Sequence, residues 1–201
     1  GLRLTSLEQN CRLYPSYKKV LEAKNLCYPP RTAIKISENS VEVDLQQLLD
    51  HTAQRIIQSQ ETVIDTLSTE DLQNLKLFLK WGCDGSSGHS EYKQTFEGED
   101  NSDTSIFLTS VVPLQLVYTD DKLDKEIIIW KNPRTSSPRF CRPLRMQFLQ
   151  ETTESTRTEI SYVENQINNL LPFESTFNEN NFKISYIMNL TMIDGKVCSA
   201  I

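Results

Sequence analysis

Two aspartates follow strand-like runs of the chain, at positions where they could share one chemical task. Asp84 comes after the alternating run 75–83, Asp194 comes after the alternating run 182–193, and each is followed by glycine. One Asp-Gly pair is an ordinary turn signal and indicates only that a strand ends. Two carboxylates at neighbouring strand ends would repel each other unless a divalent cation lay between them. The pair therefore suggests a metal site.

The run before Asp84 has the two-residue period of a β-strand with one apolar face. Asp84 falls on the more polar side of that strand, so we expect it not to be buried. Two further β-rich runs, Ile106–Tyr118 and Glu126–Trp130, are separated by a short polar segment and predict an antiparallel hairpin. Pro113 within the first of them predicts a bulge or an edge position, because proline cannot donate to a ladder.

A helix separates these strands from the last one. Thr152 or Thr153 can cap it, its apolar residues recur at helical spacing, and Pro172 ends it. A strand–helix–strand return is right-handed and makes the last strand parallel to an earlier one. We expect it to lie beside the first strand, because only that pairing brings both aspartates to one sheet edge, on strands about 4.8 Å apart. This order predicts an α/β fold, a ribonuclease H-like mixed sheet preceded by a small helical region.

Carboxylates at such an edge suit particular metals and one type of reaction. Oxygen-only ligands favour Mg²⁺ or Mn²⁺ over zinc. Two such ions about 3.5–4 Å apart can activate a nucleophile and stabilise the leaving oxygen in phosphodiester transfer. The expected cofactor is therefore a two-metal Mg²⁺ or Mn²⁺ site.

The residues before 75 predict helices. Ser40 could cap a helix with an apolar stripe from Leu45 to Ile57, and Ser68, with Asp71 three residues later, predicts a second helix start. The segment 31–40 is expected to be a connector, and 173–181 is expected to be a polar loop. The helices are too few to bury their own stripes, so we expect them to pack on another subunit or on the sheet.

One segment is basic although the chain carries a formal charge of −6. The basic loop KNPRTSSPRFCRPLR contains five cations, no acid and three prolines, which prevent a regular helix. A solvated surface explains most charge runs. This segment also suits contacts with a phosphate backbone, and its cations are Lys131, Arg134, Arg139, Arg142 and Arg145.

The cysteines and the hydropathy exclude other classes. The five cysteines are far apart and form no C-x-x-C pair, which argues for a reducing compartment and against a disulfide framework or a complete zinc site. Cys83 and Cys141 are expected to be small core residues. No apolar run reaches the roughly 20 residues of a membrane span, and no signal-peptide pattern is present, so no membrane partner is expected.

Three segments together resemble one family. WGCDGSSGHSEYK (81–93), FCRPLRMQFLQE (140–151) and TMIDGK (191–196), in this order and spacing, resemble Transib-type DNA transposases. They are similar, more distantly, to the catalytic subunit of the V(D)J recombinase. The likeness runs from about Pro15 to the end.

The resemblance assigns roles to residues. It implies that Asp84 and Asp194 are catalytic metal ligands and that Glu151 completes the metal shell; Glu151 could instead serve the first turn of the helix that follows. It implies DNA contacts from His89, Lys93 and the cations of the basic loop. A lone loop histidine is, however, more often only solvated.

The resemblance also implies that the chain is a fragment. The family's third carboxylate and a zinc-binding insertion lie farther downstream, so zinc is expected only there. The implied organisation is a dimerisation and DNA-binding region (1–38), a helical pre-catalytic linker (39–74) and the N-terminal part of the catalytic domain (75–201).

The implied function is that of a DDE-type cut-and-paste DNA transposase or recombinase. Such a protein is expected to be a nuclear homodimer that binds terminal inverted repeats and target DNA, nicks, cuts through a hairpin and joins ends. Two alternatives remain open: a domesticated DNA-binding relative without catalysis, and a ribonuclease H-like nuclease.

Overall fold

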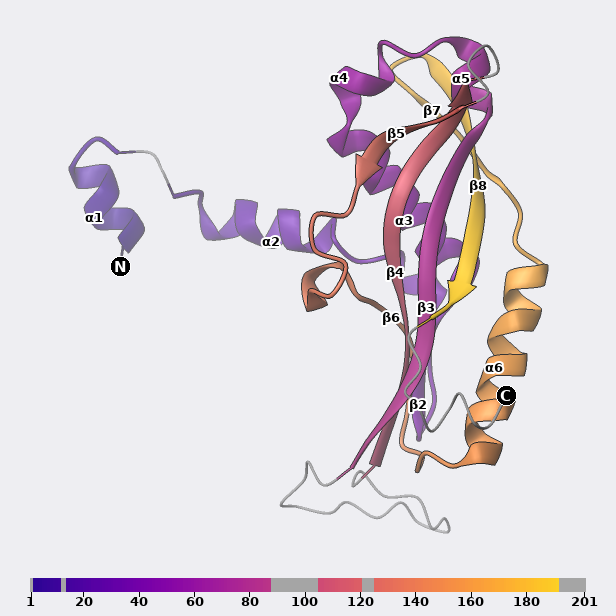
Figure 1. Ribbon diagram of the computed structural model, residues 1–201. Helices are drawn as coiled ribbons and strands as arrows, with labels where there is room; N and C mark the ends of the chain where they lie inside the picture. The colour runs from indigo at the N-terminus through magenta and orange to yellow at the C-terminus, as the bar shows by residue number, and fades with distance from the viewer. Residues whose placement is uncertain (1, 12–13, 88–104, 121–124, 192–201) are drawn as a thin grey trace.

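The computed structural model describes residues 2–11, 14–87, 105–120 and 125–191 (Figure 1). These residues form a mixed α/β structure around one curled sheet with parallel and antiparallel strands. The helical elements are α1 (Leu2–Glu8), α2 (Tyr17–Asn25), η1 (Arg31–Ala33), α3 (Leu45–Ser59), α4 (Glu61–Ile64), α5 (Thr69–Gln73), η2 (Pro138–Phe140) and α6 (Thr153–Asn168). The strands are β1 (Ile34–Ile36), β2 (Ser40–Val43), β3 (Leu75–Ser87), β4 (Ser105–Asp120), β5 (Lys125–Lys131), β6 (Arg142–Gln147), β7 (Phe173–Phe177) and β8 (Asn180–Leu190).

The strand order confirms a central prediction from the sequence. The sheet runs β1-β2-β6-β4-β3-β8-β7, and β5 also pairs with β4. β3 and β8 are adjacent and parallel, from Leu75 opposite Ile184 to Trp81 opposite Leu190. The other pairings are antiparallel. The first and last predicted strands therefore lie side by side and run in the same direction.

The alternation along β3 directs one of its faces into the hydrophobic core. The side chains on that face are buried, whereas Lys76, Phe78 and Lys80 on the other face are half-buried. α3 crosses behind the sheet in Figure 1, and its apolar stripe joins the same buried cluster as Ile160 and Val163 of α6. The buried residues of β3 are Leu75, Leu77, Leu79, Trp81 and Cys83.

The residues before α3 differ from the expectation. Ser40 does not cap this helix; it begins β2, and the cap is Asp44, whose side chain accepts from the Gln47 amide. The predicted connector contains β1 and β2, which add a hairpin to the edge of β6. Pairing with a distant strand decides this conformation, and the local sequence does not reveal it. The Ser68–Asp71 capping box before α5 is confirmed.

The segment after α6 is another correction. The predicted polar loop 173–181 contains β7, which pairs antiparallel with β8. Asn178 and Glu179 both have positive φ, as the two-residue turn between twisted strands requires. The polar residues of β7 obscure the hydrophobic alternation by which a strand is recognised in a sequence.

The strands that precede α6 agree with the sequence. β4 and β5 form the predicted antiparallel pair. The ladder between β3 and β4 shifts register where Leu79 pairs with Pro113, so the bulge at this proline is confirmed. Between the end of β5 at Lys131 and the start of β6 at Arg142, the basic loop contains only η2, which fits its three prolines.

The N-terminal helices extend away from the sheet (Figure 1). α2 buries none of its residues, and Tyr17, Val20 and Leu21 on it are exposed. In contrast, α3 packs its apolar stripe on the sheet. Packing on the sheet is one of the two outcomes expected for the helices before residue 75.

No helix in the described part of the chain combines the length and the apolar character needed to cross a membrane.

Candidate functional site

Asp84 lies near the end of the central strand with its side chain exposed. It pairs with Leu108 of β4, and the preceding residue, Cys83, is buried in the core. This agrees with the expectation that Asp84 lies on the polar side of the strand. On the other side of β3, the ladder with β8 ends near this position, where the Thr191 amide donates to the Trp81 carbonyl oxygen at 3.1 Å. Asp84 therefore lies three residues beyond Trp81, the last residue of β3 that pairs with β8.

Glu151 packs against the residue that follows Asp84. It is half-buried between β6 and α6, next to the helix cap Thr152. A Cβ atom added to Gly85 would lie 2.7 Å from Oε2 of Glu151 and closer still to its Cβ. Only a glycine leaves room for this approach, because real Cβ contacts are longer. The structure thus brings Asp84 and Glu151, two of the predicted metal ligands, to the same end of β3.

Negative charge gathers around this end of the strand. Burial raises the pKa of the Cys83 thiol to about 11, and the carboxylates of Glu159, Glu151 and Asp84 add to the shift in that order. A nearby anion disfavours the thiolate, so these three side chains lie within electrostatic reach of Cys83. Cys83 is therefore a buried thiol in an acidic environment, which agrees with its prediction as a core residue, and not a nucleophile.

The donor chemistry at this end suits a hard cation. Asp84 and Glu151 offer only oxygen ligands, which Mg²⁺ and Mn²⁺ prefer. Neighbouring residues of a strand face opposite sides of the sheet, so Asp84 points away from the side on which Glu151 meets Gly85. The residues that the structure describes contain no group of three or more His, Cys, Asp or Glu side chains able to hold a metal ion. Asp194, His89 and Lys93 lie outside the described residues.

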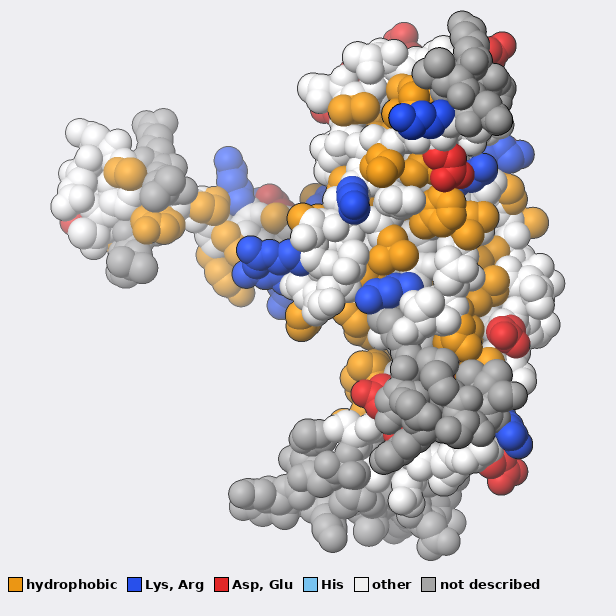
Figure 2. Space-filling model, viewed as in Figure 1, with side chains coloured by type: hydrophobic (Ala, Val, Ile, Leu, Met, Phe, Trp, Pro, Cys, Tyr) orange, Lys and Arg blue, Asp and Glu red, His pale blue; other side chains and the backbone are white. Residues whose placement is uncertain are grey.

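The basic loop places its five cations in two different settings. Lys131, Arg134 and Arg139 are exposed, whereas Arg142 and Arg145 are half-buried. Burial lowers the pKa of the Arg142 guanidinium, and the cation of Arg55 contributes in the same direction. Figure 2 shows Lys and Arg side chains along α2 and over the adjoining middle of the sheet. The exposed cations are the ones that a phosphate backbone can approach.

Asn132 anchors the start of the basic loop. Its side chain is buried and donates from Nδ2 to the Pro113 carbonyl oxygen at 2.8 Å, while Oδ1 accepts from the Arg134 amide at 2.9 Å. Its own amide donates to the Leu114 carbonyl oxygen. The bulge in β4 therefore fixes the position of Arg134, and no local pattern in the sequence indicates this contact.

Arg145 is part of a buried polar network. Glu159 of α6 is 2% exposed, and its carboxylate accepts three hydrogen bonds: from Arg145 at 2.9 Å, from Gln147 at 3.0 Å and from Thr109 at 2.6 Å. These donors satisfy a charge that would otherwise be costly inside the protein. The network connects α6 to β4 and β6 beside the end of β3.

Glu42 extends this network to β2. Its Oε1 accepts from the Tyr162 hydroxyl at 2.7 Å, and its Oε2 lies 3.7 Å from Nε of Arg145, an ion-pair distance. The guanidinium of Arg145 also lies over the Tyr162 ring, 4.5 Å from its centroid. Burial raises the pKa of Tyr162 to about 12, and its hydrogen bond to Glu42 adds to the shift. Arg145 thus has intramolecular partners, and its contact with phosphate stays a prediction.

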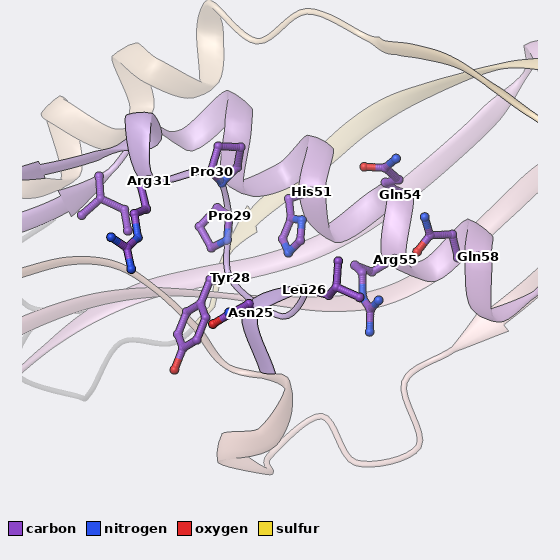
Figure 3. Close-up of a pocket in the computed structure, with 11 residues that line it drawn as sticks. Asn25, Leu26, Tyr28, Pro29, Pro30, Arg31, His51, Gln54, Arg55 and Gln58 are labelled. Atoms are coloured by element: carbon purple, nitrogen blue, oxygen red, sulfur yellow. The ribbon is translucent and has the colours of Figure 1, made fainter. Parts of the chain in front are cut away.

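A second concave region lies between the end of α2 and α3 (Figure 3). Its volume is about 810 Å³, and Arg31, His51 and Arg55 are among its lining residues. These residues come from separate segments, so no local motif joins them. The only trace in the sequence is the Tyr28-Pro-Pro-Arg31 segment, whose prolines end the N-terminal helical region and indicate no site by themselves.

Comparison of the chain with models of protein families gives no match, and comparison with curated proteins gives none either.

Proposed function

We propose that this chain is part of a DDE-type DNA transposase or recombinase that cuts and joins DNA with divalent metal ions. Within it, Asp84, Asp194 and Glu151 act as metal ligands, and the exposed cations of the basic loop bind the DNA backbone. The resemblance of three segments to Transib-type transposases motivates the proposal. The expected homodimer, nuclear localisation and terminal inverted repeats follow from the same resemblance.

One structural observation carries the proposal: Asp84 and Glu151 lie at the same end of the central strand, with Gly85 leaving room for Glu151. The parallel pairing of β3 with β8, and the antiparallel pairing of β3 with β4, are the strand relations that a ribonuclease H-like domain requires. Asp194 follows β8 by four residues in the sequence. These facts are compatible with a two-aspartate site at one edge of the sheet.

Different residues of the chain would have different roles in the proposed reaction. The carboxylates supply oxygen ligands and hold the negative charge that retains the cations. Bound Mg²⁺ or Mn²⁺ would supply the activation of the attacking oxygen and the stabilisation of the leaving oxygen. Arg134 and Arg139 would hold the phosphate backbone, and the network around Glu159 would keep α6, and with it Glu151, in register with β3.

Metal binding can be tested on the 201-residue chain itself. Mn²⁺ binding measured by titration calorimetry should weaken by roughly tenfold or more in Asp84→Asn, because the amide cannot replace a charged oxygen ligand. Glu151→Gln should weaken it less if Glu151 only completes the shell. Glu154→Gln is the matched control, since Glu154 is an exposed acid in the first turn of α6. Equal affinities in Asp84→Asn and the parent would contradict the proposed metal site.

The reaction itself needs the longer protein to which the chain is proposed to belong. There, Asp84→Asn and Asp194→Asn should bind a labelled terminal-repeat duplex as well as the parent but fail to nick it in Mg²⁺. Phosphate contacts elsewhere hold the DNA, while removal of a metal ligand reduces stabilisation of the transition state. Normal nicking by either variant would refute the mechanism. Retained metal-independent DNA binding with no nicking by the parent would favour the non-catalytic relative.

A further inference from the structure

The pocket between α2 and α3 concentrates positive charge. Its lining includes Arg31 from η1 together with His51 and Arg55 from α3, and no Asp or Glu is among the lining residues that the structure describes. Arg142 of the basic loop is also close, because its cation and that of Arg55 act on His51. Within the described ranges, Arg31, Arg55 and Arg142 form no ion pair with an acidic side chain. Figure 3 shows Arg31 at one end of the pocket and Arg55 at the other, with His51 between them, so an anion beside His51 would face uncompensated positive charge from both sides.

His51 points into this pocket from α3. Figure 3 shows its ring directed from α3 toward the segment that carries Tyr28 and Pro29. Its Nε2 atom is buried and has no partner among the residues that the structure describes. Burial lowers the pKa of His51, and the cations of Arg55 and Arg142 lower it further. A buried polar atom without a partner is rare in proteins, so this atom indicates a place for a ligand acceptor or donor.

The rest of the lining suits a group larger than a single ion. Asn25, Gln54 and Gln58 contribute amides, which can both donate and accept hydrogen bonds. Tyr28 is exposed beside them and offers a ring face. The volume of about 810 Å³ exceeds what a lone anion needs. The pocket can therefore hold an anion that is attached to a larger molecule.

We propose that this pocket binds a phosphate group, carried either by a nucleic-acid strand or by a small phosphorylated molecule. Arginine guanidinium groups match phosphate oxygens in geometry and charge, and His51 supplies one further hydrogen-bonding atom. Neither Asp84 nor Glu151 is among the described residues that line this pocket. Where a nucleic-acid strand carries the phosphate, the site rests on the proposed function and deepens it, but it requires neither metal ions nor strand cleavage.

The first experiment uses inorganic phosphate and the two histidines of the chain, His51 and His89. Their imidazole signals are followed by NMR as phosphate is added at constant ionic strength. A bound anion offsets the cations of Arg55 and Arg142, which lower the pKa of His51, so this pKa should rise on saturation. The His51 signal should shift with a saturable dependence in the parent but not in the Arg31→Gln/Arg55→Gln double variant. A linear, non-saturating change at His51 would overturn the proposal.

Two exposed arginines of the pocket provide the variants. Arg31→Gln and Arg55→Gln should each weaken phosphate binding by about tenfold, since each removes a charge-assisted hydrogen bond. Arg157→Gln is the matched control, because Arg157 is an exposed arginine on α6, outside the pocket. An equal loss in Arg157→Gln would show a general charge effect and overturn the proposed site.

A second probe separates the two sources of phosphate. A fluorescein-labelled single-stranded oligonucleotide is titrated with the parent, the Arg31→Gln/Arg55→Gln double variant and the control, using anisotropy. If the pocket holds a strand, the double variant should bind the oligonucleotide at least tenfold more weakly than the control. If it holds a small molecule, only the affinity for inorganic phosphate should fall. Unchanged affinity for both probes would overturn the proposal, whatever the outcome of the metal and nicking experiments.

Discussion

The acidic end of β3 and the basic pocket beside α3 are built in opposite ways. At the end of β3, Glu151 packs directly on Gly85, and the buried carboxylate of Glu159 is saturated by three hydrogen bonds. In the pocket, Arg31 and Arg55 are exposed and the buried Nε2 of His51 has no partner within the described residues. The first region is fixed by internal contacts, whereas the second keeps its charges available.

This difference separates stability from binding. A buried charge is tolerated in the fold only while its internal partners remain. Removal of one partner therefore lowers the free energy of unfolding. An exposed cation contributes little to stability, so its removal is detected only when a ligand is present. Substitutions in the two regions should therefore be detected by different measurements.

The largest expected effect is on stability at Arg145. Arg145→Gln leaves the carboxylates of Glu159 and Glu42 without their cation. It should lower the free energy of unfolding by about 3 kcal/mol. This is the lower end of the range for breaking a buried ion pair, and it applies here because water reaches part of Arg145. Arg55→Gln should change it by less than about 0.5 kcal/mol. Urea unfolding of both variants measures this contrast, and equal losses would remove the distinction between the two regions.

Several elements could be predicted because their signals are local. The alternation in β3, the Ser68–Asp71 capping box, the Thr152 cap and the stripe of α3 each depend on residues a few positions apart. The parallel direction of β8 followed from the order of elements and the handedness of crossovers, and its place beside β3 followed from the expectation that Asp84 and Asp194 share one metal. These two kinds of signal are sufficient to predict that Asp84 lies at the end of a central strand.

Other features depend on partners that are distant in the sequence. β1, β2 and β7 are short and partly polar, and they become strands because β6 and β8 offer edges to pair with. The contact between Glu151 and Gly85 joins residues 66 positions apart. Arg134 and Arg145 are both arginines of the basic loop, and the sequence does not distinguish them. Only the fold shows that Arg145 has two carboxylate partners. The basic pocket combines two segments with no common motif.

The next effect tests the close contact at the acidic end. Gly85→Ala forces Glu151 away from β3 and should weaken Mn²⁺ binding by about tenfold, the effect of removing one charge-assisted ligand. If the effect acts through Glu151, adding Gly85→Ala to Glu151→Gln should have little further effect. Titration calorimetry on the single and double variants measures this coupling. Additive losses would show that Gly85 acts by another route.

A smaller effect distinguishes the exposed part of the basic loop. Replacing Arg134 and Arg139 by glutamine should weaken binding to any DNA duplex and reduce the slope of log affinity against log salt by about 0.9 for each phosphate that the protein no longer neutralises. Arg157→Gln should leave the slope unchanged. Anisotropy titrations over a series of salt concentrations measure it. A slope identical to that of the parent would show that these two arginines are only solvated.

The smallest effect is a pH dependence of stability at the basic pocket. The pKa of His51 lies below its ordinary value of 6.5, mainly through burial and also through the cations of Arg55 and Arg142; Arg31 lines the other end of the same pocket. Between the lowered pKa and 6.5, the unfolded chain binds more protons at this residue than the folded chain does. The contribution of His51 to stability should therefore be complete above pH 6.5 and decrease as pH falls through that interval.

Urea unfolding of the parent and His51→Gln across the interval isolates this contribution, because the carboxylates titrate alike in both proteins. The Arg55→Gln variant should show a weaker dependence, since one of the cations that lower the pKa is gone. A constant difference in stability between the parent and His51→Gln at all pH values would mean that His51 does not experience the charges of the pocket.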